Sequence, residues 1–163
     1  MELYYHVGHI DGQYVFNEGD LWPRINKRSY SDEVRSEVEK RLENYRPKQC
    51  FSRYTSLFVV KTEDEACSWA HRKGINNFIL YELDYDGQVN WHISDYYDRF
   101  FELLKKEKGL LPSIYETMPK IKSLQEAANL YWEECNNLNN NDFYYEGLID
   151  GCPKIIKRTE IVL

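Results

Sequence analysis

Short stretches of this chain combine aromatic, β-branched and other apolar residues, and turn-forming residues interrupt them. Such stretches are typical of strands, because flat and branched side chains pack well on a pleated surface. Short turns separate the strand of residues 77–83 from that of 89–93, and that of 143–149 from that of 155–162, so we expect each pair to form a hairpin. The sequence predicts strands at residues 3–9, 13–16, 51–61, 77–83, 89–93, 143–149 and 155–162.

Elsewhere the apolar residues recur at three-to-four spacing, which indicates helices. Thr62 and Glu65 have the spacing of a capping box, in which an N-cap side chain and a later Glu each bond the other's backbone. Ser94 is expected to cap a further helix. The sequence predicts helices at residues 31–46, 62–73, 94–108 and 123–134, and polar loops at 17–30 and 136–142.

The order of these elements predicts a single α+β domain over residues 1–163. Strands open and close the chain, and helices are inserted between the inner strands, which differs from the regular alternation of a doubly wound sheet. No Gly-x-Gly-x-x-Gly or Walker-type Gly-Lys-Ser/Thr motif occurs. A bound nucleotide would therefore not be held by a glycine-rich phosphate turn.

Composition narrows the choice of partners. Hydrophobic residues make up 42% and aromatic residues 15% of the chain, which is too much for a disordered acidic chain even with a net charge of −6. The pI of about 5.3 argues against a surface that follows nucleic-acid phosphates, since that binding needs many Lys and Arg side chains. We therefore expect a folded domain whose macromolecular partner is a protein rather than a nucleic acid.

Targeting signals and metal-binding motifs are not evident. No segment is apolar for long enough to cross a bilayer, and the first residues lack the features of a signal peptide, so we expect a cytoplasmic protein that does not bind membranes. The four cysteines are widely spaced and form no Cys-x-x-Cys pair. We therefore predict reduced thiols and no metal site.

Three features remain as candidates for chemistry. His6 lies in the first strand, a Ser- and Tyr-containing run covers residues 51–58, and Glu146 lies at the start of a late strand. Their order resembles the three-part signature of the ADP-ribosyltransferase fold, which has an Arg or His on the first strand, an aromatic-Ser-x-Ser type run and a late Glu. The chain is also similar to small uncharacterised bacterial domains of that superfamily.

This resemblance implies an ADP-ribosyltransferase-like fold, with a split mixed or antiparallel β-sheet, flanking helices and NAD between two strand layers. It also implies an NAD-dependent transfer of ADP-ribose to an unknown acceptor, or hydrolysis of NAD. Breaking the nicotinamide–ribose bond builds positive charge on the ribose, which a carboxylate stabilises. Glu146 is the implied catalytic residue.

The other candidates would bind NAD. His6 would hold a ribose hydroxyl, Tyr54 would stack on nicotinamide, and Ser56 or Ser52 would bond the carboxamide or orient the catalytic glutamate. Arg53 and Tyr54 alternate on the predicted strand, so only one of them is expected to face the cleft. If Arg53 faces inward, it becomes a pyrophosphate ligand.

Structural explanations compete with these roles. His6 can be an ordinary core histidine, and Glu146 can be the charged residue of an edge strand. Tyr144 stands where relatives that modify arginine often have a second acidic residue, which argues against that acceptor chemistry. The alternatives are thus a non-catalytic nucleotide- or protein-binding module of the same fold, or an inhibitor or immunity-like protein. A small enzyme of this type is compatible with the role of a toxin, a defence factor or a phage-encoded modifier.

Overall fold

The computed structural model describes residues 1–10, 15–110 and 116–162. The predicted turn at 11–12 and the first half of the predicted strand 13–16 lie outside these ranges, and residues 15–16 are not in a strand. The elements follow in the order β1 (Leu3–His9), α1 (Glu33–Glu43), β2 (Leu57–Val59), α2 (Glu63–Arg72), β3 (Asn77–Asp84), β4 (Val89–Ile93), α3 (Ser94–Glu107), α4 (Leu124–Trp132), β5 (Tyr145–Ile149) and β6 (Lys154–Val162).

The strands form two antiparallel sheets, ordered β1-β3-β6 and β2-β5-β4. The sheets are linked where Tyr5 and Val60 exchange two backbone hydrogen bonds of 3.0 and 2.9 Å. Four helices of the described ranges flank them, so the predicted α+β class is confirmed.

Both predicted hairpins are wrong. β3 pairs with β1 and β6, whereas β4 pairs with β5, so each of the two short connections carries the chain from one sheet to the other. Tyr85 lies at both connections, since a Cβ atom added to Gly87 or Gly151 would collide with its ring. Composition predicted these four strands but does not specify their partners.

Two local expectations also need correction. The predicted strand 51–61 is reduced to β2, because residues 51–56 form a turn. Ser94 does not cap α3, whose N-cap is Ile93, and its hydroxyl donates instead to the Tyr144 carbonyl at 3.2 Å. The capping box of Thr62 and Glu65 on α2 is confirmed.

Alternating residues of β3 serve two apolar cores. Ile79, Tyr81 and Leu83 are buried in a cluster that also contains residues of β2 and β5, so the two sheets pack face to face there. Phe78 and Leu80 point the other way and pack against α2. This period of two explains why β3 is apolar along nearly its whole length.

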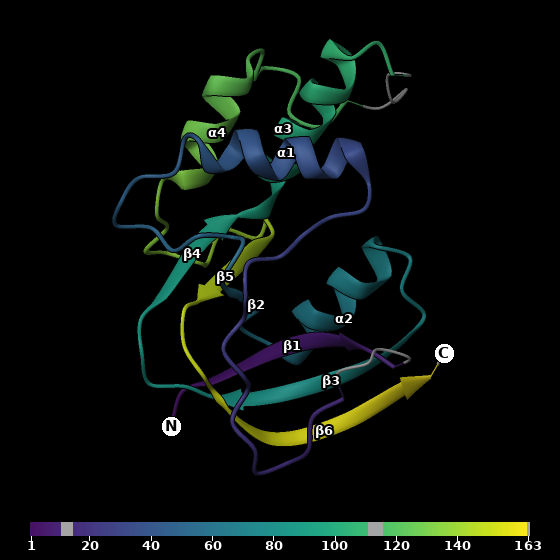
Figure 1. Cartoon of the computed structure of the whole chain (residues 1–163), viewed down its shortest axis with the longest axis vertical. Helices are drawn as coiled ribbons and strands as arrows, with labels where there is room; N and C mark the ends of the chain where they lie inside the picture. The colour runs from purple at the N-terminus through teal and green to yellow at the C-terminus, as the bar shows by residue number, and fades with distance from the viewer. Residues whose placement is uncertain (11–14, 111–115, 163) are drawn as a thin grey trace.

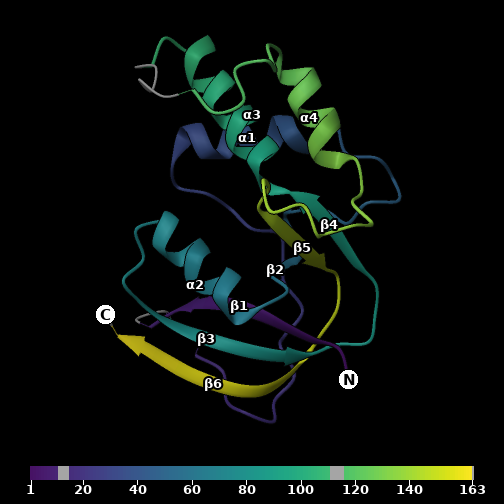
Figure 2. The ribbon, with the colours of Figure 1, turned by 180° about the vertical axis from the view of Figure 1, so that it is seen from behind.

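A third core lies between the sheet β2-β5-β4 and the helices α1, α3 and α4, which gather on one side of that sheet (Figure 1). Helix α2 instead lies over β1 and β3 in both views (Figures 1 and 2). The fold thus places α2 opposite α1 and α3. None of the helices in the described ranges has the length and apolar character needed to cross a membrane.

Truncating the fully buried Leu148 tests the third core. Leu148→Ala should lower the free energy of unfolding by about 2–5 kcal/mol, because it removes packed methyl groups and leaves a cavity. Urea unfolding followed by circular dichroism measures the change. Leu21→Ala is the matched control, since Leu21 is 63% exposed and should cost less than about 0.5 kcal/mol. Equal losses in the two variants would contradict this assignment of the core.

Candidate functional site

The described residues form a cleft of about 1110 Å³. Residues of β1 and α2 line one side, and residues of α1 and α3 line the other. His6, Arg53 and Glu146 all contribute to its surface. The structure therefore brings together three of the six residues that the sequence nominated, from segments far apart in the chain.

A tight turn before β2 positions Arg53. The hydroxyl of Ser52 accepts a hydrogen bond from the Tyr54 backbone N–H at 3.1 Å, and the Phe51 N–H donates to the Asn90 side chain at 2.7 Å. Arg28 donates from Nη1 to the carbonyls of Arg53 and Ser56, at 2.7 and 2.6 Å. Side chains thus replace the strand pairing that was expected here.

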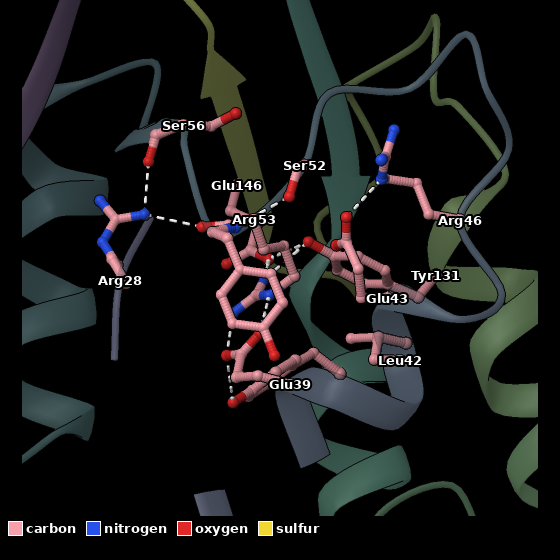
Figure 3. A network of polar contacts seen from close by, with 12 residues as sticks. Arg28, Glu39, Leu42, Glu43, Arg46, Ser52, Arg53, Ser56, Tyr131 and Glu146 are labelled. Carbon is pink, nitrogen blue, oxygen red and sulfur yellow. Dashed lines mark hydrogen bonds and ion pairs between the residues drawn. The ribbon is translucent and has the colours of Figure 1, made fainter. Parts of the chain in front are cut away.

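The Arg53 side chain points into the protein and lies between two carboxylates (Figure 3). Its Nε and Nη2 donate to the two oxygens of Glu39 on α1, at 2.9 and 3.1 Å. Its Nη1 donates to Oε1 of Glu146 on β5. The three side chains are almost completely buried, so these are ion pairs inside the protein rather than on its surface.

Two tyrosine hydroxyls complete the network. Tyr97 on α3 donates to Glu39 at 2.9 Å, and Tyr131 on α4 donates to Oε1 of Glu146 at 2.6 Å. The rings also contact the cation, with the Arg53 guanidinium carbon 4.1 Å from the centre of the Tyr97 ring. Elements of both the helical layer and the sheet therefore converge on one guanidinium.

The charges of the network stabilise one another. Burial disfavours the Glu39 carboxylate, but Arg53 outweighs that effect and holds the pKa of Glu39 below its ordinary value. Burial likewise opposes the Arg53 charge, yet Tyr131, Glu146 and Glu39 raise its pKa well above the ordinary value. Burial raises the pKa of Tyr97 well above its ordinary value, so its hydroxyl stays a donor.

Glu146 differs from Glu39 because it also reaches the cleft. Its Oε1 accepts from Arg53 and Tyr131, whereas Oε2 bonds none of the described residues. The carboxylate is thus held by one oxygen, with the other left for a ligand.

His6 lies on β1 and is partly buried. Its Nδ1 donates to the Phe58 carbonyl at 2.6 Å, and its ring meets Trp22 edge-on with 4.8 Å between ring centres. Burial lowers the pKa of His6 to about 4, so the ring is neutral at pH 7. Because a carbonyl can only accept, Nδ1 carries the proton and Nε2 keeps a lone pair.

The other nominated residues lie outside the cleft lining. Ser52 shapes the turn, Ser56 is fully buried with no hydrogen bond from its hydroxyl to the described residues, and Tyr54 is half-buried with Lys27 5.1 Å from its ring centre. The strand alternation of Arg53 and Tyr54 does not apply, because neither is in a strand. Arg53 does face inward, but its charge is already matched by carboxylates.

Several residues of the site had no clear sequence signal. Glu39 adjoins the apolar stripe of α1, and Arg28 falls in the predicted loop 17–30. His92 is fully buried. Its ring stacks on Tyr131 with 4.9 Å between ring centres, and its Nδ1 donates to the Tyr131 carbonyl at 2.8 Å. Only the unusual density of tyrosines hinted at such buried polar contacts.

The cleft is positively charged, although the chain is acidic. Basic residues outnumber acidic ones in the cleft lining, with Arg28, Arg35, Arg53, Arg72, Lys73, Lys105 and Lys106 against Asp98, Glu102, Glu116 and Glu146.

No group of three or more His, Cys, Asp or Glu side chains in the described ranges could hold a metal ion.

The buried ion pair should matter far more than surface pairs on the same helix. Glu39→Gln should lower the free energy of unfolding by about 3 kcal/mol, because Arg53 loses a charged partner in the interior. The control is Glu37→Gln, whose carboxylate pairs with Arg41 and Lys108 near the surface and should cost less than about 1 kcal/mol. Urea unfolding measures both, and similar costs would contradict the stated role of Glu39.

His6 should make stability depend on pH. Between about pH 6.5 and about pH 4 the unfolded chain takes up a proton at His6 that the folded chain does not, so stability should fall as pH decreases through this window. The loss attributable to His6 is on the order of 2 kcal/mol. Burial also lowers the pKa of His92, so the test compares wild type with His6→Gln. Identical pH profiles would contradict the prediction.

Comparison with known proteins places the chain in a family. No curated protein matches the sequence. The family model described as "Protein of unknown function (DUF2441)" matches residues 15–162, which include α1 to α4, the Arg53 turn and Glu146. Since this match covers most of the chain, the protein belongs to the DUF2441 family.

Proposed function

We propose that the chain is an NAD-dependent ADP-ribosyltransferase, or a related NAD hydrolase, with Glu146 as its catalytic carboxylate. On this proposal the two linked sheets are the split sheet of an ADP-ribosyltransferase-like fold. The observation that carries the proposal is that Glu146 and His6, from different sheets, line one cleft.

The reaction breaks the bond between C1′ of the ribose and the nicotinamide nitrogen. Nicotinamide leaves with the bonding electron pair, and positive charge builds on the ribose. An acceptor group or water then bonds C1′ and loses a proton. A carboxylate next to the ribose stabilises this charge most in the transition state, which is where stabilisation accelerates the step.

The contacts of Glu146 suit this task. Arg53 and Tyr131 fix Oε1, while Oε2 is left for a ribose hydroxyl at the cleft surface. Arg53 alone would weaken the negative charge, but Glu39 supplies a second carboxylate to the same guanidinium. A carboxylate held in place before the substrate arrives needs no reorganisation during the reaction.

His6 is suited to binding the ribose of NAD. A neutral ring whose Nδ1 is committed to Phe58 offers Nε2 as an acceptor for a ribose hydroxyl. Tyr54, Ser52 and Ser56 lie outside the cleft lining, and the Ser52 hydroxyl bonds within the Arg53 turn, so the proposal rests on Glu146 and His6 rather than on these three residues. The acceptor of ADP-ribose is proposed to be a protein, because the chain is acidic overall.

One observation favours a second candidate, a non-catalytic nucleotide- or protein-binding module of the same fold. Glu146 is bonded to Arg53, and an ion pair is also a sufficient structural reason for a glutamate at this position. A module of this kind would bind a ligand in the cleft without cleaving it, as an inhibitor or immunity-like protein can.

Glu146→Gln separates these candidates. The variant should release nicotinamide from NAD at least about a hundredfold more slowly than wild type, because it loses the charge that stabilises the ribose cation. Release is measured by chromatography, with and without a cell lysate as a source of acceptor.

The control is Glu133→Gln, since Glu133 is exposed and outside the cleft lining, and it should turn over like wild type. Because Glu146→Gln also removes a partner of Arg53, urea unfolding must first show that the variant is folded at the assay temperature. NAD binding without nicotinamide release by wild type would favour the binding module, and unchanged turnover in Glu146→Gln would refute its catalytic role.

A further inference from the structure

Four of the cations that line the cleft have no anionic partner among the described residues. Lys73 pairs with Asp98 at 3.7 Å and Lys106 with Glu116 at 2.5 Å, so these charges are balanced. Arg28, Arg35, Arg72 and Lys105 make no such ion pair. Unmatched guanidinium groups at a concave surface are ready partners for an anionic ligand.

Two hydrogen bonds and a ring contact hold the Arg28 side chain in place. Its Nη1 donates to the backbone carbonyls of Arg53 and Ser56, and its guanidinium carbon lies 4.8 Å from the centre of the Phe58 ring. These neutral contacts fix the side chain and leave the Nη2 and Nε donors without partners in the described part of the chain. Burial lowers the pKa of Arg28, which shows that its charge is only partly hydrated.

Arg35 also lines the cleft and lies in the first turn of α1. Its guanidinium carbon is 4.7 Å from the centre of the Tyr30 ring. The positive charges of Arg53 and, to a smaller extent, Arg35 add to burial in lowering the pKa of Arg28. Such mutual repulsion is relieved when an anion binds between the two groups.

Arg53, the arginine that the sequence nominated as a pyrophosphate ligand, is unsuited to that role. Glu39 and Glu146 occupy its guanidinium, and a phosphate would have to displace a buried carboxylate. Arg28, in contrast, keeps donors at the cleft that no carboxylate occupies.

We propose that Arg28 and Arg35 form the anion subsite of the cleft and bind the diphosphate of a nucleoside diphosphate ligand. Guanidinium groups present several donors to the oxygens of two linked phosphates, and aromatic contacts hold both side chains toward the cleft. The assignment deepens the proposed function and rests on it, since NAD carries such a diphosphate.

Calorimetric titration with ADP-ribose, and with adenosine as the probe that lacks phosphate, tests this subsite. ADP-ribose should bind wild type more tightly than adenosine, and its affinity should fall as salt is added. Arg28→Gln and Arg35→Gln should each weaken ADP-ribose binding about tenfold or more and leave adenosine binding unchanged. Lys40→Gln is the control, because Lys40 is exposed on α1, the helix that carries Arg35, and is not in the cleft lining.

The outcomes separate this proposal from the catalytic one. Arg28→Gln can disturb the Arg53 turn, whereas the guanidinium of Arg35 makes no hydrogen bond to the described residues, so the Arg35 variant gives the decisive result. ADP-ribose affinity that is unchanged in Arg35→Gln, or no ADP-ribose binding by wild type, overturns the subsite. Arginine-dependent ADP-ribose binding without NAD cleavage supports the subsite and refutes the catalytic proposal.

Discussion

The pairing of the buried Arg53 guanidinium with two carboxylates is the interaction on which the arrangement of this protein depends. A cation without a partner in the protein interior would be very costly, and here two carboxylates from different layers of the fold enclose it. Glu39 comes from α1 and Glu146 from β5. Satisfying one charge therefore fixes the position of a helix relative to the central strand of a sheet and brings Glu146 to the wall of the cleft.

The same requirement links stability to function. The tyrosines that bond the two carboxylates come from α3 and α4, so the helical layer packs on the sheet through polar contacts as well as through its apolar core. A substitution in this network acts on the fold and on the cleft together. Measurements of activity therefore need the stability of each variant beside them.

Features with a local cause were predictable from the sequence. The capping box of Thr62 and the strand at residues 77–83 each depend on neighbouring residues, and both are present. The strand partners were not predictable, because β3 and β4 follow one another in sequence yet join different sheets. His6, Arg53 and Glu146 were nominated from the sequence, and the structure brings them to one cleft. Glu39 was missed because its pairing is a tertiary contact within an otherwise ordinary helix.

The partners of Arg53 are spread widely along the chain, with Glu39 14 residues before it, Tyr131 78 residues after it and Glu146 93 residues after it. During synthesis the guanidinium thus leaves the ribosome long before its later carboxylate exists. Until β5 has been made, Arg53 and the cleft beside it have no stable arrangement, and closing such distant contacts is slow. The nascent chain consequently has no activity at the cleft until folding has brought Glu146 to Arg53.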